Sequence, residues 1–200
     1  MKQEKNKAAD ASPSYKETLN LLKTSFSMRA NSTIREPELQ AFWKNKGIDF
    51  DLGLSNKGPV FTLHDGPPYA NGSLHMGHAL NKVLKDIINK FNIMRGSQVR
   101  FVPGWDCHGL PIELNVEKKH GKKSNLVKDK ESFQKACKEY AQSQISDQLE
   151  DFKRLGVFGD WENSYMSLDS KFEADIIRSF GVIFDAGHIE KGEKPVHWCQ

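Results

Sequence analysis

The clearest hydrophobic pattern in the chain lies between residues 58 and 103. Residues 60–64 (VFTLH) are β-branched and aromatic and are bounded by GP and DGPP, which predicts a short strand. From 74 to 91 apolar residues recur at helical spacing, with lysines and an aspartate between them, and Gly96 ends the predicted helix. Residues 98–102 (QVRFV) then predict a second strand, which PG closes.

This order of strand, glycine-rich loop, amphipathic helix and strand predicts one βαβ unit. Such a unit pairs its strands in parallel through a right-handed crossover. In sheets of this kind the ligand crevice lies beyond the carboxyl ends of the strands. Two segments, 64–75 and 103–111, are placed there, and the unusual residues of the sequence are concentrated in them.

The rest of the chain gives weaker patterns. Residues 1–14 read as a disordered lead-in, and the segment 15–28 has four apolar anchors: Leu19, Leu21, Leu22 and Phe26. A helix is predicted from Thr33 and Pro37 to Gly47, with Leu39, Phe42 and Trp43 on its packing stripe. Two further helices are predicted at 130–155 and 169–186, and residues 193–198 indicate the start of another strand.

Composition narrows the class of protein only modestly. The chain has 200 residues, a formal net charge of +3 and an odd number of cysteines, three, which lie far apart at Cys107, Cys137 and Cys199. That pattern argues against a disulfide framework and favours a reducing compartment, so we expect a cytoplasmic protein. No apolar run approaches the roughly 20 residues of a membrane span, and the polar, basic first ten residues indicate no secretory signal.

The first candidate site is the string HMGH at 75–78. His75 and His78 lie on one face at a helix start, while Gly72 and Gly77 leave room for a ligand to approach the backbone. The free N–H groups of a first helical turn favour an anion, and imidazole donors can stabilise charge on phosphate oxygens. This predicts a nucleotide-phosphate site; the plainer alternative is that both histidines are ordinary surface residues.

A metal site is the sharper alternative at the same place. If the strand ends bring His75, His78, Asp106, Cys107 and His108 together, they could bind zinc in a hydrolase. The HExxH spacing of zinc hydrolases is absent, because Met76 occupies the place of its general base. We therefore treat metal catalysis as the lesser hypothesis.

The second candidate site is PGWDCHGLPIE at 103–113. Asp106 is placed where a carboxylate can bind an ammonium group, with Pro103 and Trp105 as walls. Alternatively, Asp106 bonds the backbone of its own turn, as aspartates in Gly/Pro loops often do. The residues alone leave both possibilities open.

These motifs resemble those of class I aminoacyl-tRNA synthetases. HMGH is similar to their HIGH signature, and HDGPPYANG at 64–72 together with PGWDCHGLPIE resembles isoleucyl-tRNA synthetases in particular. Valyl enzymes have strings like PNVTG and PGTDHAG instead, and leucyl enzymes have strings like PYPSG and GWDAFGLPAE. Shorter agreements extend the resemblance over 15–200, among them RLGVFGDW at 154–161 and KPVHWC at 194–199.

The resemblance implies an α/β fold: the first half of a Rossmann-like nucleotide-binding domain, a parallel sheet flanked by helices, truncated at the start of an editing insertion. It implies a helical segment at 15–57 packing on the catalytic domain, the half domain at 58–192, and the beginning of the connection to the insertion at 193–200. The expected partners are L-isoleucine, ATP and tRNA(Ile), and the full-length protein is expected to be a monomer that binds no membrane.

The implied reaction is ATP-dependent activation of L-isoleucine to isoleucyl-adenylate with Mg²⁺ present, followed by transfer to tRNA. The resemblance gives the catalytic role to His75 and His78. It assigns amino-acid binding to Pro68, Trp105 and Asp106. Seven residues would bind ATP or the adenylate: Gly66, Pro67, Pro68, Tyr69, Asn71, Gly72 and Gly77.

Some family features are missing from these 200 residues. The KMSKS signature and the anticodon-binding helices are absent, and Cys199 has no partner cysteines for the zinc knuckle that some relatives have. We therefore expect no complete metal site here and no adenylation by this piece alone. The alternative is a synthetase-like module that binds nucleotide without catalysis. An exposed sheet edge also predicts poor solubility.

Overall fold

The computed structural model describes residues 15–198, so the predicted lead-in at 1–14 and Cys199 lie outside the described part. Its helices are η1 (Tyr15–Thr18), α1 (Ser32–Lys46), α2 (Phe50–Ser55), α3 (Met76–Met94), α4 (Leu110–His120), α5 (Asn125–Lys128), α6 (Lys130–Arg154) and α7 (Ser170–Asp185). Its strands are β1 (Val60–Thr62), β2 (Gln98–Arg100), β3 (Gly104–Trp105) and β4 (Tyr165–Met166). Within the described residues, no helix joins enough length to enough apolar character to cross a membrane.

The predicted parallel strand pair is confirmed. β1 pairs with β2 in parallel, with Val60 opposite Gln98, and α3 connects them. Both strands are shorter than the sequence predicts, but the two segments pair again farther along. The Asp106 N–H donates to the Pro68 carbonyl over 2.9 Å, and the Ala70 N–H donates to the Asp106 carbonyl over 2.8 Å. The segments that follow β1 and β2 are therefore held side by side.

A second parallel pair, β3 with β4, was not predicted from the sequence. Gly104 lies opposite Tyr165 and Trp105 opposite Met166. Two-residue strands are too short to show an alternating pattern, so the sequence carries no signal for them. The segment 98–106 consequently has the residues after β1 on one side and β4 on the other.

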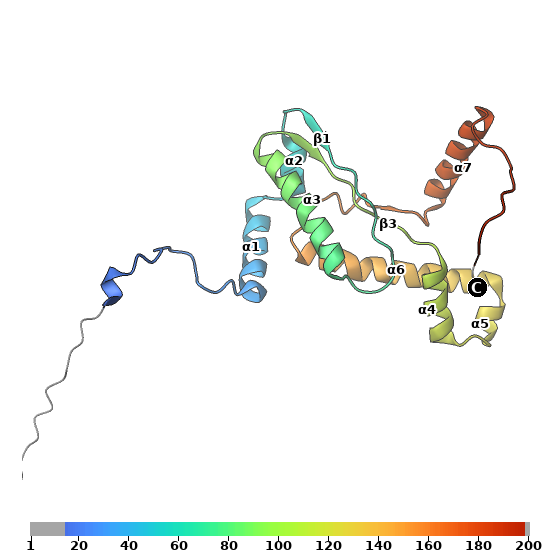
Figure 1. The fold of residues 1–200 in the computed structure, drawn as a ribbon, viewed down its shortest axis with the longest axis horizontal. Helices are drawn as coiled ribbons and strands as arrows, with labels where there is room; N and C mark the ends of the chain where they lie inside the picture. The colour runs from blue at the N-terminus through green and yellow to red at the C-terminus, as the bar shows by residue number, and fades with distance from the viewer. Residues whose placement is uncertain (1–14, 199–200) are drawn as a thin grey trace, which may run out of the picture.

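Helix α6 organises the larger of two apolar clusters. In Figure 1 it runs across the middle of the molecule, from α4 and α5 near its start to α1 near its end. Its predicted stripe is confirmed at Ala141, Ile145 and Phe152, which are buried against Trp105 and Ile112. The smaller cluster contains Phe50, Phe101 and Val157.

Helix α1 is attached to the end of α6 by polar and aromatic contacts. The Gln40 side-chain amide donates to the carbonyls of Lys153 and Arg154 over 3.2 and 2.8 Å, and Arg154 pairs with Glu36 at 2.7 Å. Trp43 meets Phe158 edge to face, with ring centroids 5.8 Å apart. Of the three apolar residues predicted to form a packing stripe, Leu39 and Phe42 are exposed and only Trp43 packs.

The orientation of α3 differs from that of an ordinary amphipathic helix. Its buried side chains are polar, Lys82, Asp86 and Asn89, and its apolar stripe is exposed. The polar side is held inward because Asp86 accepts a hydrogen bond from the Phe158 N–H (2.8 Å) and Lys82 pairs with buried Asp65. The 3.6-residue period thus predicted the helix correctly, but it did not predict which face of the helix is buried by the rest of the described chain. We name the exposed set the outer face of α3: Leu80, Val83, Leu84, Ile87, Ile88 and Phe91.

Two other expectations are wrong. Residues 193–198 form no strand, and the four anchors predicted in 15–28 are exposed because that segment extends away from the other elements (Figure 1). Helix α7 forms as predicted, but none of its described side chains is buried. Helices α2, α4 and α5 were not predicted. Helix α4 has only two buried positions, Ile112 and Val116, and its last turn is basic, so its sequence shows no clear apolar stripe.

Candidate functional site

The two histidines of HMGH stack on each other at the start of α3. Their ring centroids are 3.8 Å apart with the planes inclined by 23°. The Gly77 N–H donates to His75 Nδ1 over 3.1 Å, and the His75 N–H donates to His78 Nδ1 over 3.3 Å. Because each Nδ1 accepts a hydrogen bond from the backbone, each neutral ring has its own proton on Nε2. The helix start therefore presents two N–H donors that no backbone group occupies.

The surroundings of His78 favour its neutral form. Burial lowers the pKa of its imidazole, and the nearby His75 ring and Lys82 ammonium lower that pKa further. A neutral imidazole can donate from Nε2 while its Nδ1 keeps the bond to the His75 N–H. His78 can therefore provide a hydrogen-bond donor for an anion without adding a fixed positive charge.

The loop between β1 and α3 is fastened to α6 and α4. Gly72, at φ 80°, donates its N–H to Gln144 Oε1 over 2.7 Å, and its carbonyl accepts from Gln148 Nε2 over 2.8 Å. Asn71 Oδ1 accepts from the Tyr140 hydroxyl over 2.9 Å and from Asn115 Nδ2 over 2.7 Å. The Asn71 side chain is thus used within the protein, where it fixes the loop.

The other predicted loop residues differ in exposure. Gly66 and Pro67 are exposed, and Pro68 is buried. Tyr69 is half-buried, which raises the pKa of its phenol, and its hydroxyl lies so close to Gly109 that a Cβ there would be 2.9 Å away. Gly109 has φ 118°, so both the backbone and the tyrosine favour glycine at this position.

Nothing in the sequence indicates the ion pairs that anchor the base of this loop. Asp65, only 1% exposed, pairs with both Lys82 and Lys85 of α3. Lys82 is itself buried, and its ammonium lies 5.1 Å from the Phe152 ring centroid and 5.7 Å from that of Phe101. Burial lowers the pKa of Lys82, while its bond to Asp65 opposes that effect. These pairs tie the loop to the helix that presents the histidines.

Asp106 and Trp105 point to opposite sides of their segment. The Asp106 carboxylate is exposed, and Oδ1 accepts from the Ser167 hydroxyl over 3.3 Å rather than from its own turn. Trp105 is 1% exposed and donates from Nε1 to Gln148 Oε1 over 3.0 Å, within the apolar cluster. Asp106 is therefore available to a ligand, whereas the Trp105 side chain lies in the core beneath it.

The structure brings some predicted residues together and leaves others apart. Tyr69 and Asp106 are bridged through their backbones, and His75 and His78 form one pair. The five side chains of the metal hypothesis do not converge: in residues 15–198 no three His, Cys, Asp or Glu side chains are placed to hold a metal ion.

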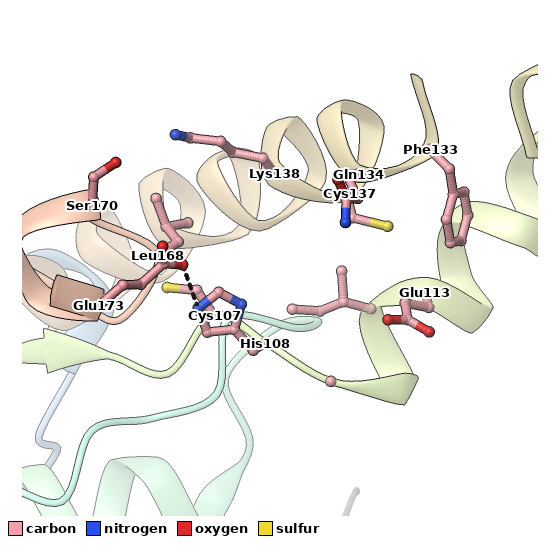
Figure 2. Close-up of a pocket in the computed structure, with 12 residues that line it drawn as sticks. Cys107, His108, Glu113, Phe133, Gln134, Cys137, Lys138, Leu168, Ser170 and Glu173 are labelled. Atoms are coloured by element: carbon pink, nitrogen blue, oxygen red, sulfur yellow. Dashed lines mark ion pairs between the residues drawn. The ribbon is translucent and has the colours of Figure 1, made fainter. Parts of the chain in front are cut away.

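A cavity of about 450 Å³ lies beside the end of the second segment (Figure 2). Cys107, His108 and Glu113 come to it from the strand end and α4, Lys138 from α6 and Glu173 from α7. The His108 ring and the Glu173 carboxylate, joined by a dashed line in Figure 2, are 3.5 Å apart. Burial raises the pKa of the Cys107 thiol, so this cysteine stays protonated. The cavity adjoins Asp106 in sequence but does not include the two histidines.

Comparison with known proteins shows the family of the chain. The family described as tRNA synthetases class I (I, L, M and V) matches residues 38–200. The isoleucine–tRNA ligase of one strain of Prochlorococcus marinus is 60% identical over 198 residues, which are 99% of this chain and 20% of that protein. The isoleucine–tRNA ligase of Synechococcus sp. (strain CC9311) is 58% identical over 198 residues, again 99% of this chain and 20% of the relative. The chain thus spans about a fifth of the length of these curated relatives.

A solved structure has a similar fold. It is the crystal structure of the ternary complex of Agrobacterium radiobacter K84 LeuRS with tRNA and LeuAMS, with a TM-score of 0.57 and 24% identity. The match covers 80% of this chain and 18% of that chain. With the family matched over more than three quarters of its length, the chain belongs to the class I tRNA synthetases of the I, L, M and V group.

Proposed function

We propose that this chain is the HMGH-bearing part of an isoleucine–tRNA ligase. The proposed reaction is the ATP-dependent activation of L-isoleucine to isoleucyl-adenylate, followed by transfer of the isoleucyl group to tRNA(Ile). The structural observation that carries this proposal is the pair of stacked imidazoles at the start of α3, each of which accepts a backbone N–H at Nδ1 and has Nε2 for a ligand. Identity of 58–61% with isoleucine–tRNA ligases over at least 93% of the chain supports the choice of amino acid.

The activation step would use these donors as follows. A carboxylate oxygen of isoleucine attacks the α-phosphorus of ATP, a new P–O bond forms, and the bond to the leaving pyrophosphate breaks. Negative charge shifts onto phosphate oxygens, where the Nε2–H groups of His75 and His78 and the first-turn N–H groups of α3 other than that of Gly77 can stabilise it. Mg²⁺ would accompany ATP and neutralise part of its charge.

The loop residues would shape the adenylate site around that centre. We assign adenylate contacts to Gly66, Pro67, Pro68, Tyr69 and Gly72, and Gly77 keeps the start of α3 open to the phosphates. Asn71 would act by fixing the loop, since its side-chain oxygen already accepts two hydrogen bonds.

Asp106 would bind the α-ammonium group of isoleucine. Its exposed carboxylate supports this role, because its hydrogen bond from Ser167 leaves other acceptor positions available. Pro68 would lie beside the amino acid, and Trp105 would support Asp106 from beneath.

We further propose the domain organisation that the resemblance implies: a helical segment at 15–57, half of the catalytic domain at 58–192, and the beginning of a connection at 193–200. The full-length protein would act as a cytoplasmic monomer, with tRNA(Ile) as its macromolecular partner. The chain by itself would not form the adenylate, because KMSKS and other family parts are absent from its 200 residues. A zinc site, if the full-length protein has one, would need ligands besides Cys199.

The test is isoleucine-dependent ATP–pyrophosphate exchange by the full-length protein, with valine, leucine and methionine in parallel. We expect the strongest exchange with isoleucine and a loss of about a hundredfold or more in His78→Ala. His120→Ala, which changes an exposed histidine at the end of α4, is the matched control and should leave exchange unchanged. Absence of exchange with every amino acid, from a folded protein, would favour the non-catalytic nucleotide-binding module instead.

A further inference from the structure

Gln148 is a fully buried polar residue in an apolar environment. It is 0% exposed and lies on α6 beside the larger cluster, between the buried positions Ile145 and Phe152. Its Oε1 accepts from Trp105 Nε1 over 3.0 Å. Its Nε2 donates to the carbonyls of Tyr69 and Gly72 over 3.1 and 2.8 Å. Both amide hydrogens and the amide oxygen are thus in use.

The three partners of Gln148 come from the two segments that form the site. Tyr69 and Gly72 belong to the loop after β1, and Trp105 immediately precedes Asp106 in the segment after β2. One turn earlier on α6, Gln144 accepts from the Gly72 N–H, so both backbone groups of Gly72 are bound by glutamines. Helix α6 therefore binds both segments, in addition to the backbone hydrogen bonds that join them directly.

An apolar side chain would suit this position better if filling the core were its only role. Burying a primary amide costs free energy that its hydrogen bonds only roughly recover, and Ala141, Ile145 and Phe152 show that α6 otherwise packs apolar groups here. The amide instead provides directional hydrogen bonds, which fix two carbonyls and an indole N–H relative to one another.

We propose that Gln148 is a positioning residue for amino-acid activation, which sets the loop Tyr69–Gly72 relative to Trp105 and Asp106. This inference rests on the proposed function. Gln148 touches no substrate; it acts by holding the adenylate loop at a fixed separation from the carboxylate that would bind the ammonium group. The backbone hydrogen bonds that join the two segments remain when those of Gln148 are lost, but the loop end at Gly72 and the Trp105 ring should then shift, so both substrates would bind in poorer alignment.

The test is Gln148→Met in the full-length protein, because methionine has a similar volume without the hydrogen bonds. In ATP–pyrophosphate exchange we expect KM for isoleucine and KM for ATP to rise about tenfold each, with a further loss in kcat from misalignment. A residue that only stabilises the fold would change the fraction of active protein, which lowers apparent kcat and leaves both KM values unchanged.

Two variants on the same helix provide controls. Ile145→Ala removes buried volume beside Gln148 but none of the hydrogen bonds to the two segments, so it should lower stability and leave both KM values unchanged. Gln142→Met changes an exposed glutamine and should change neither property. Gln144→Met, at a half-buried position, removes only the bond to Gly72 and should raise KM for ATP a few-fold more than KM for isoleucine.

The outcomes separate the two proposals. If the unmodified protein shows no isoleucine-dependent exchange, the proposed function fails and this inference fails with it. If the unmodified protein is active and Gln148→Met keeps both KM values, only the positioning role is overturned. Should Gln148→Met fail to fold, Gln144→Met decides: unchanged KM values for both substrates overturn the inference, and the expected rise for ATP supports it.

Discussion

Single side chains connect the loop, the histidines and the interior. Asp65 joins the loop to α3, because its carboxylate forms ion pairs with two lysines of that helix. One of them, Lys82, lies four residues after His78. The sequence shows HDG and LNKVLK as separate strings, and nothing in their spacing indicates that a carboxylate would be buried between two lysines 17 and 20 residues away. The histidine pair was predictable, since its geometry depends on one helical turn only.

Asp65→Asn should destabilise α3 more than Lys82→Met does. Removing the carboxylate leaves Lys82 buried without an opposite charge, a change of about 3 kcal/mol in this kind of site. Lys82→Met leaves Asp65 paired with Lys85 and should have a smaller effect. Hydrogen exchange of the α3 amides in the full-length protein measures both, and we expect roughly a hundredfold faster exchange for Asp65→Asn. Equal effects of the two variants would contradict this assignment of partners.

The pH dependence of activation should reflect His78. Because burial lowers its pKa from the ordinary value of about 6.5, the unfolded chain binds the proton more tightly than the folded protein. The folded geometry is therefore favoured above about pH 6.5 and is lost as pH falls through the lowered pKa, when protonation of Nδ1 breaks the bond to the His75 N–H. We expect kcat/KM for exchange to fall on this acid limb. The residual activity of His78→Gln should not show this fall in kcat/KM at acid pH. If the fall is unchanged in the variant, it is caused by the protonation of another group.

Among the elements, α6 was the most predictable and α3 the most misleading. The stripe of α6 faces this chain's own apolar cluster, so the usual inward preference of apolar residues applies. On α3, polar contacts with Asp65, Phe158 and Gly156 turn the charged face inward. Periodicity reports two faces but does not say which one the neighbouring residues will bind. The glutamines of α6 were missed for the same reason, because their partners are 72 to 79 residues away in the loop.

Attachment of α1 should depend on Trp43. Besides its contact with Phe158, the Trp43 ring lies under the Lys90 ammonium at 5.0 Å, and α1 has no buried residue of its own. We expect Trp43→Ala to increase hydrogen exchange in α1 while the protection of α6 stays the same. Phe42→Ala is the matched control, since this neighbouring ring is 51% exposed. Equal effects of the two variants would show that Trp43 does not fasten the helix.

At the scale of the whole molecule, the described chain leaves two large apolar faces exposed. One is the outer face of α3, and the other is on α7, which projects from the rest in Figure 1 and exposes Ile177, Phe180 and Ile183. The sequence predicted an exposed sheet edge as the cause of poor solubility, and the structure shows exposed apolar helical faces as well. The chain makes up only 20% of a curated relative, so such faces have additional chain to meet in the relatives.

The isolated 200-residue chain should therefore self-associate. We expect light scattering to show oligomers or aggregates that bind a hydrophobic dye, and Ile87→Glu combined with Ile177→Glu should reduce both signals. Lys118→Glu together with Lys123→Glu changes exposed charge without changing apolar area and serves as the control. A monomer that binds no dye would show that the chain rearranges to cover the outer face of α3 and the apolar face of α7.

The reversed orientation of α3 has a consequence for biosynthesis. In a protein of the relatives' length, about four fifths of the chain would lie outside these 200 residues. At ordinary elongation rates, that remainder takes roughly a minute to emerge from the ribosome. Wherever α3 is made before the residues that cover it, the nascent chain would expose Leu84, Ile88 and Phe91, apolar side chains of the kind that molecular chaperones bind. The helix that carries the two histidines would then also be a site of aggregation risk during synthesis.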